Sequence, residues 1–382
     1  MKANCLTIAI EEEYQIVDAV GDLKAHTKTL LTEHGEPLGD AVHPDEIQSM
    51  VEAGTGVCET VEQARERVAA LRAHIGGALA EAGLRMACAG THPFSAWHEQ
   101  LITDKDRDNM LEDEMQDVVR SIPIFGLHVY VAIPDWELGI EVMNESRYFL
   151  PHLLALSTSS PFWAGRDTGL KSYRSVIWSS FPRTGVPPDF VSREEYENYL
   201  EMLVKTGSVQ DGKRIWWDLR PDPHSPMLEF RCCDQTTRLE ETLCMAALIQ
   251  AICTKLLKLR ERNLGFRKYM PALIAENRWR AVRYGIDCKL IDFGKQAEVP
   301  MPDLAIELLE FIDDVVGDLG SRKAVEHVNT ILREGTSADR QLNAHRDCGV
   351  LAAVVDRVCE ETVAAFLPAP GEASQQRSTR CP

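Results

Sequence analysis

Three consecutive glutamates near the start of the chain are the first residues whose types and spacing could do chemistry. They lie at the centre of the apolar stretch IAIEEEYQIVD, which runs from Ile8 to Asp18. Side chains alternate along a strand, so Glu11 and Glu13 are expected on one face and Glu12 on the other. Two neighbouring carboxylates repel each other unless a positive charge lies between them. The pattern therefore predicts a cationic group beside Glu11 and Glu13.

Three further strand-like stretches each carry an acid or a histidine among apolar neighbours. They are QSMVEAGTGVC with Glu52, FGLHVYVAI with His128 and MLEFRCCD with Glu229. In a shared sheet these side chains can converge with those of Glu11 and Glu13, and carboxylates with one imidazole suit Mg²⁺ or Mn²⁺. The alternative interpretation is that the acids lie on solvent-exposed faces and that His128 is a hydrogen-bonded core or edge histidine.

A set of cations lies close to these acids in the sequence. Arg231 is two residues from Glu229, so both side chains leave the strand on one face. Arg220 ends the segment WWDLR, and Lys171 and Arg174 lie in DTGLKSYR. A guanidinium beside metal-bound carboxylates can hold a phosphate or a substrate carboxylate. Surface ion pairs are the competing interpretation.

The elements that must position these residues follow from periodicity and turn signals. The alternation of apolar and charged positions in the strands predicts an antiparallel sheet with one face lined for chemistry. The segment Ser157–Pro188 is too long and too aromatic for a plain linker, and such loops often carry function. The expected strands are Leu6–Asp18, Gln48–Cys58, a short one in LRMACAGTHPF, Ile124–Ile133 and a hairpin around Pro221–Pro226. The expected helices are Val61–Ala82, Met110–Arg120, Ile140–Ser157 with a kink or split at Pro151, Leu239–Leu257, Leu304–Val316, Arg322–Arg333 and Val350–Phe366.

Composition narrows the functional classes. The formal net charge is -18 over 382 residues, which argues against general binding to nucleic acid or to an anionic membrane. The first residues, MKANCLTIAIEEE, show no secretory signal, and no uninterrupted apolar run reaches the roughly 20 residues of a membrane span. The eleven cysteines include no C-x-x-C and fit reduced thiols better than disulfides or a zinc site. A cytoplasmic location is expected.

Seven ordered segments resemble one known family. They are IEEEYQIVD, QSMVEAGTGVC, CAGTHPF, GLHVYVAI, STSSPFWAGRDTGLKSYRS, WWDLRPDPHSPMLEFRCCD and ENRWRAVRYGIDCKLID. Together they resemble the carboxylate–amine ligases of the glutamate–cysteine ligase type 2 family. The resemblance runs from about residue 5 to about residue 365. No G-x-G-x-x-G or G-x-x-x-x-G-K-[ST] motif supports a dinucleotide fold or a P-loop instead.

The resemblance implies an α+β fold with a curved antiparallel sheet of the glutamine-synthetase-like type. Helices would pack on its outer face, and the C-terminal third would be helical. It also implies one catalytic domain over residues 1–366. The polar, Pro-, Gly- and Ser-biased composition of residues 367–382 predicts a disordered tail. The implied reaction transfers the γ-phosphoryl group of ATP to a carboxylate, such as the γ-carboxylate of glutamate. An amine such as that of cysteine then attacks the acyl phosphate, so the partners are small molecules. A homodimer is expected.

The resemblance also assigns roles to individual residues. Arg231 and Arg174 would be catalytic, and Arg231 and Lys171 would bind the nucleotide or acyl phosphate. Arg220 is expected to share in that binding because it lies among the cations close to the acids. One further acid is expected about a turn before Glu52, where Asp45 and Glu46 both qualify. The implied ligands of Mg²⁺ (or Mn²⁺) are Glu11, Glu13, Glu52, His128 and Glu229.

One position departs from the family pattern. Many relatives read G-L-H-V-H-V-G, whereas this chain has Tyr130 and Ala132 where a second histidine and a glycine are usual. Tyr130 is a poor Mg²⁺ ligand but can donate a hydrogen bond. Tyr130 therefore favours one alternative to the ligase, a weakly active or inactive member that binds a nucleotide or an amino acid. A related guanidino or phosphoryl transferase on the same fold is a second alternative.

Overall fold

A seven-stranded antiparallel sheet forms the centre of the computed structural model, which describes residues 6–34, 41–44, 47–103, 114–120 and 122–365. The strand order is β10-β11-β5-β1-β3-β2, and β4 pairs with the end of β1. The sequence-based expectation of mixed helices and an antiparallel sheet is confirmed. The strands are β1 (Ile8–Val17), β2 (Val42–Pro44), β3 (Met50–Gly54), β4 (Arg85–Ala87), β5 (Gly126–Ala132), β10 (Leu219–Pro221) and β11 (Met227–Asp234).

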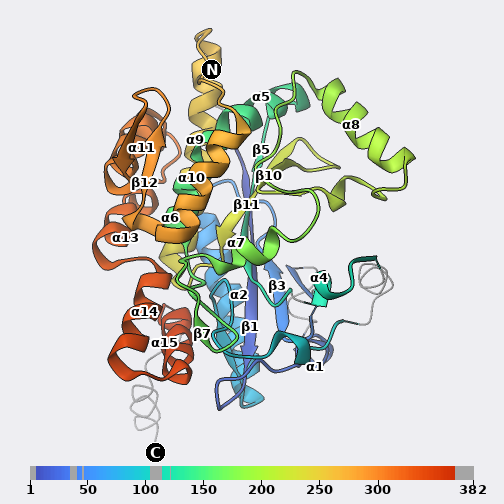
Figure 1. Ribbon diagram of the computed structural model, residues 1–382, viewed down its shortest axis with the longest axis vertical. Helices are drawn as coiled ribbons and strands as arrows, with labels where there is room; N and C mark the ends of the chain where they lie inside the picture. Colours follow the sequence, from blue (N-terminus) through green and yellow to red (C-terminus); the bar gives the residue numbers. More distant parts are fainter. Residues whose placement is uncertain (1–5, 35–40, 45–46, 104–113, 121, 366–382) are drawn as a thin grey trace, which may run out of the picture.

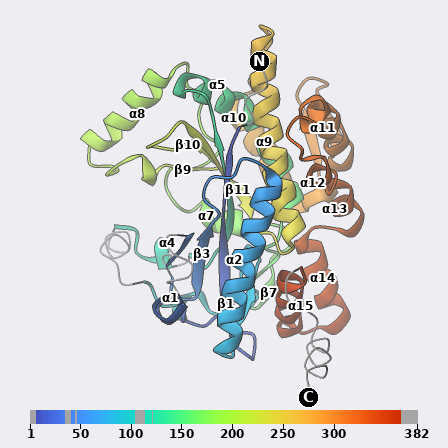
Figure 2. The same ribbon diagram turned by 180° about the vertical axis from the view of Figure 1, so that it is seen from behind.

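Helices cover one face of this sheet. In Figure 2, α2 (Val61–Glu81) and α9 (Leu239–Glu261) run in front of the strands, and α5 (Trp136–Ser146) lies beside the upper end of α9. The apolar residues of β1, β5 and β11 that point to this face are buried, among them Ile10, Val129 and Phe230. They pack with α9 in the main core. The opposite face of the sheet is left for polar side chains.

The helix α9 is the one described helix long and apolar enough to cross a membrane by length and composition. Within its most apolar stretch, 78% of the residues are buried inside the protein. It contacts β1, β5, α2 and α5, so it has the packing of a central core helix.

The expected helix Ile140–Ser157 is two helices in the structure. α5 ends at Ser146, a 3₁₀ turn spans Arg147–Phe149, and α6 covers Leu150–Ser157. Pro151 lies in the first turn of α6, where a missing N–H costs nothing because no helical partner exists there. The proline therefore marks the split that its position predicted.

The expected long loop Ser157–Pro188 contains ordered elements. Figure 1 shows α7 (Tyr173–Trp178) in front of the strands, on the face opposite α2 and α9. The short strands of this region are β6 (Phe162–Trp163) and β7 (Arg166–Asp167), which pair with each other, and β8 (Thr184–Gly185), which pairs with β9 (Trp216–Trp217). The helix α8 (Arg193–Lys205) follows and projects to one side of the molecule (Figure 1).

The chain after α9 is mainly helical, as expected, and lies along the other side (Figure 1). The expected helix Arg322–Arg333 is divided into two, and a hairpin and two helices were not foreseen. The elements here are α10 (Pro271–Tyr284), β12 (Lys289–Asp292), β13 (Ala297–Pro300), α11 (Met301–Val316), α12 (Arg322–Val325), α13 (Val328–Glu334), α14 (Ser337–Cys348) and α15 (Leu351–Val363).

The described residues also form two short helices, α1 (Thr27–His34) and α4 (Asp117–Arg120). The latter covers the end of the expected helix Met110–Arg120, whose first residues lie outside the described part of the chain. The candidate acids Asp45 and Glu46 and the tail 367–382 also lie outside it.

Candidate active site

The three glutamates of β1 divide between the two faces of the sheet, as alternation predicts. Glu11 and Glu13 line a cavity on the face that carries α7. Glu12 points to the helical face, where it is 1% exposed and accepts two hydrogen bonds from Arg72 of α2, of 2.9 and 2.5 Å. Tyr14 donates a further one of 2.8 Å to Glu12. Two of the three glutamates therefore line the cavity, and the third is part of the buried core.

The charge of Glu12 is kept in the interior by its partners. Burial opposes ionisation, but Arg72 and the hydrogen bonds from Thr242 and Gln235 outweigh it and lower the pKa of Glu12. The Arg72 side chain is completely buried and also donates to the carbonyl of Thr237 at 2.8 Å. This is a fully enclosed ion pair on the face of the sheet that packs against the helices.

The cavity on the other face has a volume of about 340 Å³. Its wall combines acids, one histidine, several cations and an apolar side. The lining residues are Glu11, Glu13, Met50, Glu52, Ile122, Ile124, His128, Tyr130, Arg174, Trp178, Lys213, Trp216, Arg220, Asp222, Pro223 and Arg231. Five further residues expected from the sequence to be in the site, each on a different element of the fold, therefore line one cavity with Glu11 and Glu13: Glu52, His128, Arg174, Arg220 and Arg231.

Strand register explains how the acids and the histidine meet. Glu11 lies opposite His128 across β1 and β5, and Glu13 lies opposite Glu52 across β1 and β3. Directly opposed residues in an antiparallel pair project from the same face. The main-chain N–H of Gly126 also donates to Glu13 Oε2 at 2.5 Å, which holds that carboxylate at the first residue of β5.

His128 lies between the two β1 carboxylates. Its Nδ1 is 3.7 Å from Glu11 Oε2 and its Nε2 is 3.8 Å from Glu13 Oε1. Within the described residues, this buried Nε2 has no hydrogen-bond partner. Burial, and then the positive charge of Arg231, lowers the pKa of His128 to about 4. The imidazole is therefore neutral near pH 7, which is the form that can ligate a metal ion.

Tyr130 replaces the usual second histidine and contacts the same carboxylate. Its hydroxyl donates to Glu11 Oε2 at 2.8 Å. Burial first, and then the charges of Glu229 and Glu11, raise the pKa of Tyr130. The side chain therefore stays a neutral phenol that donates a hydrogen bond to one oxygen of Glu11. A histidine that ligated a metal ion from this position would not make that hydrogen bond.

Glu229 is enclosed by two guanidinium groups. One oxygen accepts from Arg220 Nε and the other from Arg231 Nη1, and Glu229 is 0% exposed. Burial opposes ionisation, but the charges of Arg231 and Arg220 hold the pKa of Glu229 below its usual range. As a metal ligand, Glu229 would have to exchange at least one of these contacts. Its ligand role stays a prediction, and in this structure it forms ion pairs with both arginines.

Arg231 reaches the cavity above an aromatic side chain. Its guanidinium carbon lies 5.6 Å from the ring centre of Trp178. Burial alone would lower the pKa of Arg231, but Glu229 and then Tyr130 outweigh it and raise the pKa. Arg220 is anchored further by the carbonyls of Lys213 and Ile215, each at 2.7 Å. Arg231 is therefore the less constrained of the pair and the better placed to contact a ligand.

Arg174 enters the cavity from α7. Its Nη1 donates to the carbonyl of Arg231 at 3.4 Å. A side chain at Gly126 would occupy this space, since an added Cβ would lie 3.0 Å from both Arg174 Cζ and His128 Nε2. The absence of a side chain at Gly126 thus lets a guanidinium and an imidazole approach the same point.

Lys171 lies apart from the cavity. Its ammonium group pairs with Asp339 of α14 and lies 4.0 Å from Asp287. It is not among the residues that line the cavity. In this structure Lys171 ties the loop before α7 to the C-terminal helices, and its expected contact with a nucleotide stays a prediction.

A divalent cation suits the chemistry of the donors here. Carboxylates and one neutral imidazole with an unpartnered buried nitrogen are the ligand types that Mg²⁺ and Mn²⁺ accept. In the described part of the chain, no group of three or more His, Cys, Asp or Glu side chains is positioned to hold a metal ion as it stands. Ligation by Glu11, Glu13, Glu52 and His128 would therefore require their side chains to draw together.

Several lining residues were not foreseen. The apolar side of the cavity comes from Met50, Ile122 and Ile124, together with the tryptophans at 178 and 216. Lys213 and Asp222 add one charge of each sign. The aromatic content of the segments SVIWSSF and RIWWDLRPDP was the only signal for the tryptophans, and alternation gave none for a lysine in a turn.

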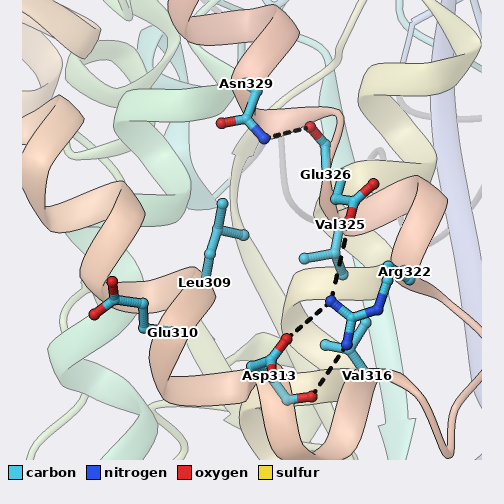
Figure 3. A pocket seen from close by; sticks show the side chains of 8 residues that line it. All are labelled: Leu309, Glu310, Asp313, Val316, Arg322, Val325, Glu326 and Asn329. Carbon is cyan, nitrogen blue, oxygen red and sulfur yellow. Dashed lines mark hydrogen bonds and ion pairs between the residues drawn. The ribbon is translucent and has the colours of Figure 1, made fainter.

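A second cavity, of about 420 Å³, lies among α11, α12 and α13 (Figure 3). Its Arg322 donates to Asp313 Oδ1 at 2.8 Å and lies 4.0 Å from Glu326. None of its lining residues comes from the sheet. No described residue that was expected in the site from the sequence lines this second cavity.

Comparison with known proteins gives a consistent result. The family model described as Glutamate-cysteine ligase family 2 matches residues 7–361. A protein of Herpetosiphon aurantiacus named "Putative glutamate--cysteine ligase 2" is 51% identical over 358 residues, which cover 94% of this chain and 93% of that protein.

Two solved structures share the fold at low sequence identity. A bifunctional glutathione synthetase from Pasteurella multocida has a TM-score of 0.71 at 15% identity, over 95% of this chain and 53% of that one. A glutamate–cysteine ligase from Francisella tularensis in complex with AMP has a TM-score of 0.68 at 14% identity, over 97% and 92% of the two chains.

Proposed function

The chain belongs to glutamate–cysteine ligase family 2, and from this premise we propose that it is an ATP-dependent ligase that joins a carboxylate to an amine. The carboxylate would be the γ-carboxylate of glutamate, and the amine would be that of cysteine or a similar small molecule. One observation carries the proposal: a single cavity gathers the carboxylates of Glu11, Glu13 and Glu52 with the guanidiniums of Arg231 and Arg174.

The proposed reaction has two steps. The substrate carboxylate attacks the γ-phosphorus of ATP, and ADP leaves, so that an acyl phosphate forms. The amine nitrogen then attacks the acyl carbon, the C–O bond to phosphate breaks, and an amide, phosphate and a proton are released. Both steps spread negative charge over phosphoryl oxygens, which fixed cations stabilise.

This chain's own residues have distinct parts in that scheme. Arg231 and Arg174 bind oxygens of the transferred phosphoryl group, and Arg220 keeps Glu229 in place so that Arg231 stays directed at the cavity. Mg²⁺ (or Mn²⁺), held by Glu11, Glu13, Glu52 and His128, would supply positive charge that offsets the phosphate oxygens. The apolar wall with its tryptophans excludes water, which would otherwise hydrolyse an acyl phosphate.

The experiment incubates the protein with ATP, Mg²⁺, glutamate and a panel of amines and identifies products by mass spectrometry. An amide with a stoichiometric amount of ADP is expected, and excess chelator should abolish both. Glu11→Gln should reduce turnover at least about 100-fold. Glu310→Gln makes the same chemical change on an exposed position of α11 and should leave turnover unaltered.

Tyr130 gives a specific reason to keep a second candidate function. Because its hydroxyl donates to Glu11 Oε2, one oxygen is shared before any metal arrives. Nucleotide binding without ADP release from any carboxylate would support a binding protein instead of a ligase. ADP release without an amide would support a phosphoryl or guanidino transferase. Full activity in excess chelator would exclude the metal-dependent scheme.

A further inference from the structure

A buried carboxylate holds together both ends of the loop that delivers Arg174. Asp234, the last residue of β11, is completely buried. Its Oδ2 accepts from the main-chain N–H of Ser159 at 2.9 Å and from the hydroxyl of Ser160 at 2.7 Å. Its Oδ1 accepts from the hydroxyl of Ser172 at 2.8 Å. One side chain therefore contacts the loop where it leaves α6 and again where it enters α7.

The hydroxyl of Ser160 passes this restraint to Arg174. It donates to Asp234 and accepts from the main-chain N–H of Arg174 at 3.1 Å. Around it, the N–H of Ser160 donates to the carbonyl of Lys171 at 3.1 Å, and the N–H of Tyr173 donates to the carbonyl of Ser160 at 2.8 Å. The first turn of α7 is thus placed relative to β11 by two hydrogen bonds in series.

The surroundings leave Asp234 little freedom. An added Cβ at Gly90 would lie 2.9 Å from Asp234 Cγ, so the absence of a side chain there makes room for the carboxylate. Burial raises the pKa of Asp234, while the positive charge of Arg174, and then the contacts from Ser159, Ser160 and Ser172, oppose that rise. Carboxylate and guanidinium therefore act on each other electrostatically as well as through the serine.

Arg174 itself is held by few side-chain contacts. Its Nη1 makes the 3.4 Å contact to the carbonyl of Arg231, and among the described residues its buried Nε has no hydrogen-bond partner. Its position in the cavity consequently depends on where the main chain of α7 is held. The main chain at Arg174 is held through Ser160 by Asp234 of β11, which lies three residues after Arg231 in the sequence.

We propose that Asp234 is a positioning residue, which acts through Ser160 and Ser172 to hold the Arg174 guanidinium in the cavity next to Arg231. The inference rests on the proposed function, since it assigns Asp234 a part in the binding of phosphoryl oxygens by that pair. A displacement of the guanidinium of about an ångström is enough to cost roughly 10²-fold in rate. The competing account is a staple that stabilises the loop without any effect specific to Arg174.

A double-mutant cycle separates the two accounts. Asp234→Ala and Arg174→Ala should each lower kcat by about 10-fold to 100-fold, and the double variant should be no slower than the slower single variant. A pure staple would instead give multiplied losses. Asp292→Ala is the matched control, because Asp292 is likewise buried and accepts two main-chain N–H groups, from Gly294 and Lys295, in the β12–β13 turn. It should lower stability without any coupling to Arg174→Ala.

Two milder variants keep the test valid if Asp234→Ala does not fold. Asp234→Asn retains the shape: its oxygen can accept from Ser159 and Ser160, and its amide can donate to Ser172. It should recover most of the activity that Asp234→Ala loses. Ser160→Ala removes only the bridging hydroxyl and should couple to Arg174→Ala as Asp234→Ala does.

Amide hydrogen exchange gives a readout that does not depend on turnover. Ser160→Ala should speed exchange of the Arg174 amide because it removes the acceptor of that amide, and Asp234→Ala should speed it because it releases the Ser160 hydroxyl that accepts there. Exchange in β1 should stay slow. Unaltered exchange at Arg174, or multiplied kinetic losses in the cycle, would overturn the positioning role. Failure of the wild-type protein to release ADP would overturn the proposed function instead, and the exchange result would still decide whether Asp234 positions Arg174.

Discussion

Glu12→Gln should destabilise the protein far more than the same substitution one residue earlier. The change removes the negative charge that faces Arg72 and keeps the size of the side chain. Arg72 is 0% exposed and Glu12 1%, so no water can replace the lost charge. Glu11 has 31% of its side chain exposed and lies in the cavity, which makes Glu11→Gln the matched control.

The magnitude follows from the enclosure of the pair. Removing one partner of a buried ion pair leaves an uncompensated charge and typically costs about 3–5 kcal/mol. A glutamine at position 12 keeps one acceptor for Arg72, but its amide group would face the donors of Tyr14 and Arg72 that now meet an oxygen. We therefore expect a loss of about 3 kcal/mol in the free energy of unfolding, with a fall in Tm of roughly 5 °C.

Urea denaturation followed by circular dichroism measures the effect. Glu12→Gln should lower the transition midpoint without changing the slope, and Glu11→Gln should leave the free energy of unfolding within about 0.5 kcal/mol of the parent. Glu12→Gln combined with Arg72→Met removes both charges and should recover part of the loss. Equal midpoints for the two single variants would refute the division of the glutamates between site and core.

Three further outcomes are expected. Arg231→Lys cannot present a planar fork to phosphoryl oxygens, so kcat should fall about 10²–10³-fold with little change in Tm; near-parental kcat with a much lower Tm would leave Arg231 only a structural role. Burial lowers the pKa of both His92 and His152 to about 4, so each takes up a proton on unfolding between about pH 4 and pH 6.5. The contribution of these two histidines to the free energy of unfolding should therefore be complete above about pH 6.5. It should fall toward pH 4 by up to ~1.4 kcal/mol per pH unit for each histidine, and the fall with pH should be shallower in His92→Gln. Nine cysteines of the described residues carry free thiols, so a reducing agent should leave Tm unchanged, and a clear drop would reveal a disulfide.

Alternation along strands predicted much of the site. The two-residue period placed Glu11 and Glu13 on one face, and short strand-like segments around Glu52 and His128 identified their neighbours. These predictions succeed because an antiparallel sheet converts spacing directly into direction. The roles of these residues in metal binding stay predictions.

Contacts between distant segments were beyond sequence reasoning. The sequence around Glu12 did not predict that its partner would be Arg72, which lies 60 residues later on a helix. Likewise Lys171 and Arg174 share one loop, yet only Arg174 turns toward the cavity, because Asp339 of α14 draws Lys171 away. Which cation of a segment reaches the cavity depends on how that segment packs against the rest of the protein. The local sequence pattern does not predict this packing.

The enclosed pair of Glu12 and Arg72 also has a consequence for how β1 can align in the sheet. A slip of β1 by a single residue would turn Glu12 into the cavity and press two carboxylates against the helical layer. Only one of those carboxylates could then meet Arg72, and the other would be buried without a counterion. Three identical residues in a row give no alignment signal by themselves, so Arg72 of α2 adds to the signal from the buried apolar residues that flank them. A deletion or insertion of one residue in β1 before Glu11 should therefore be far more harmful than one in the turn after Val17.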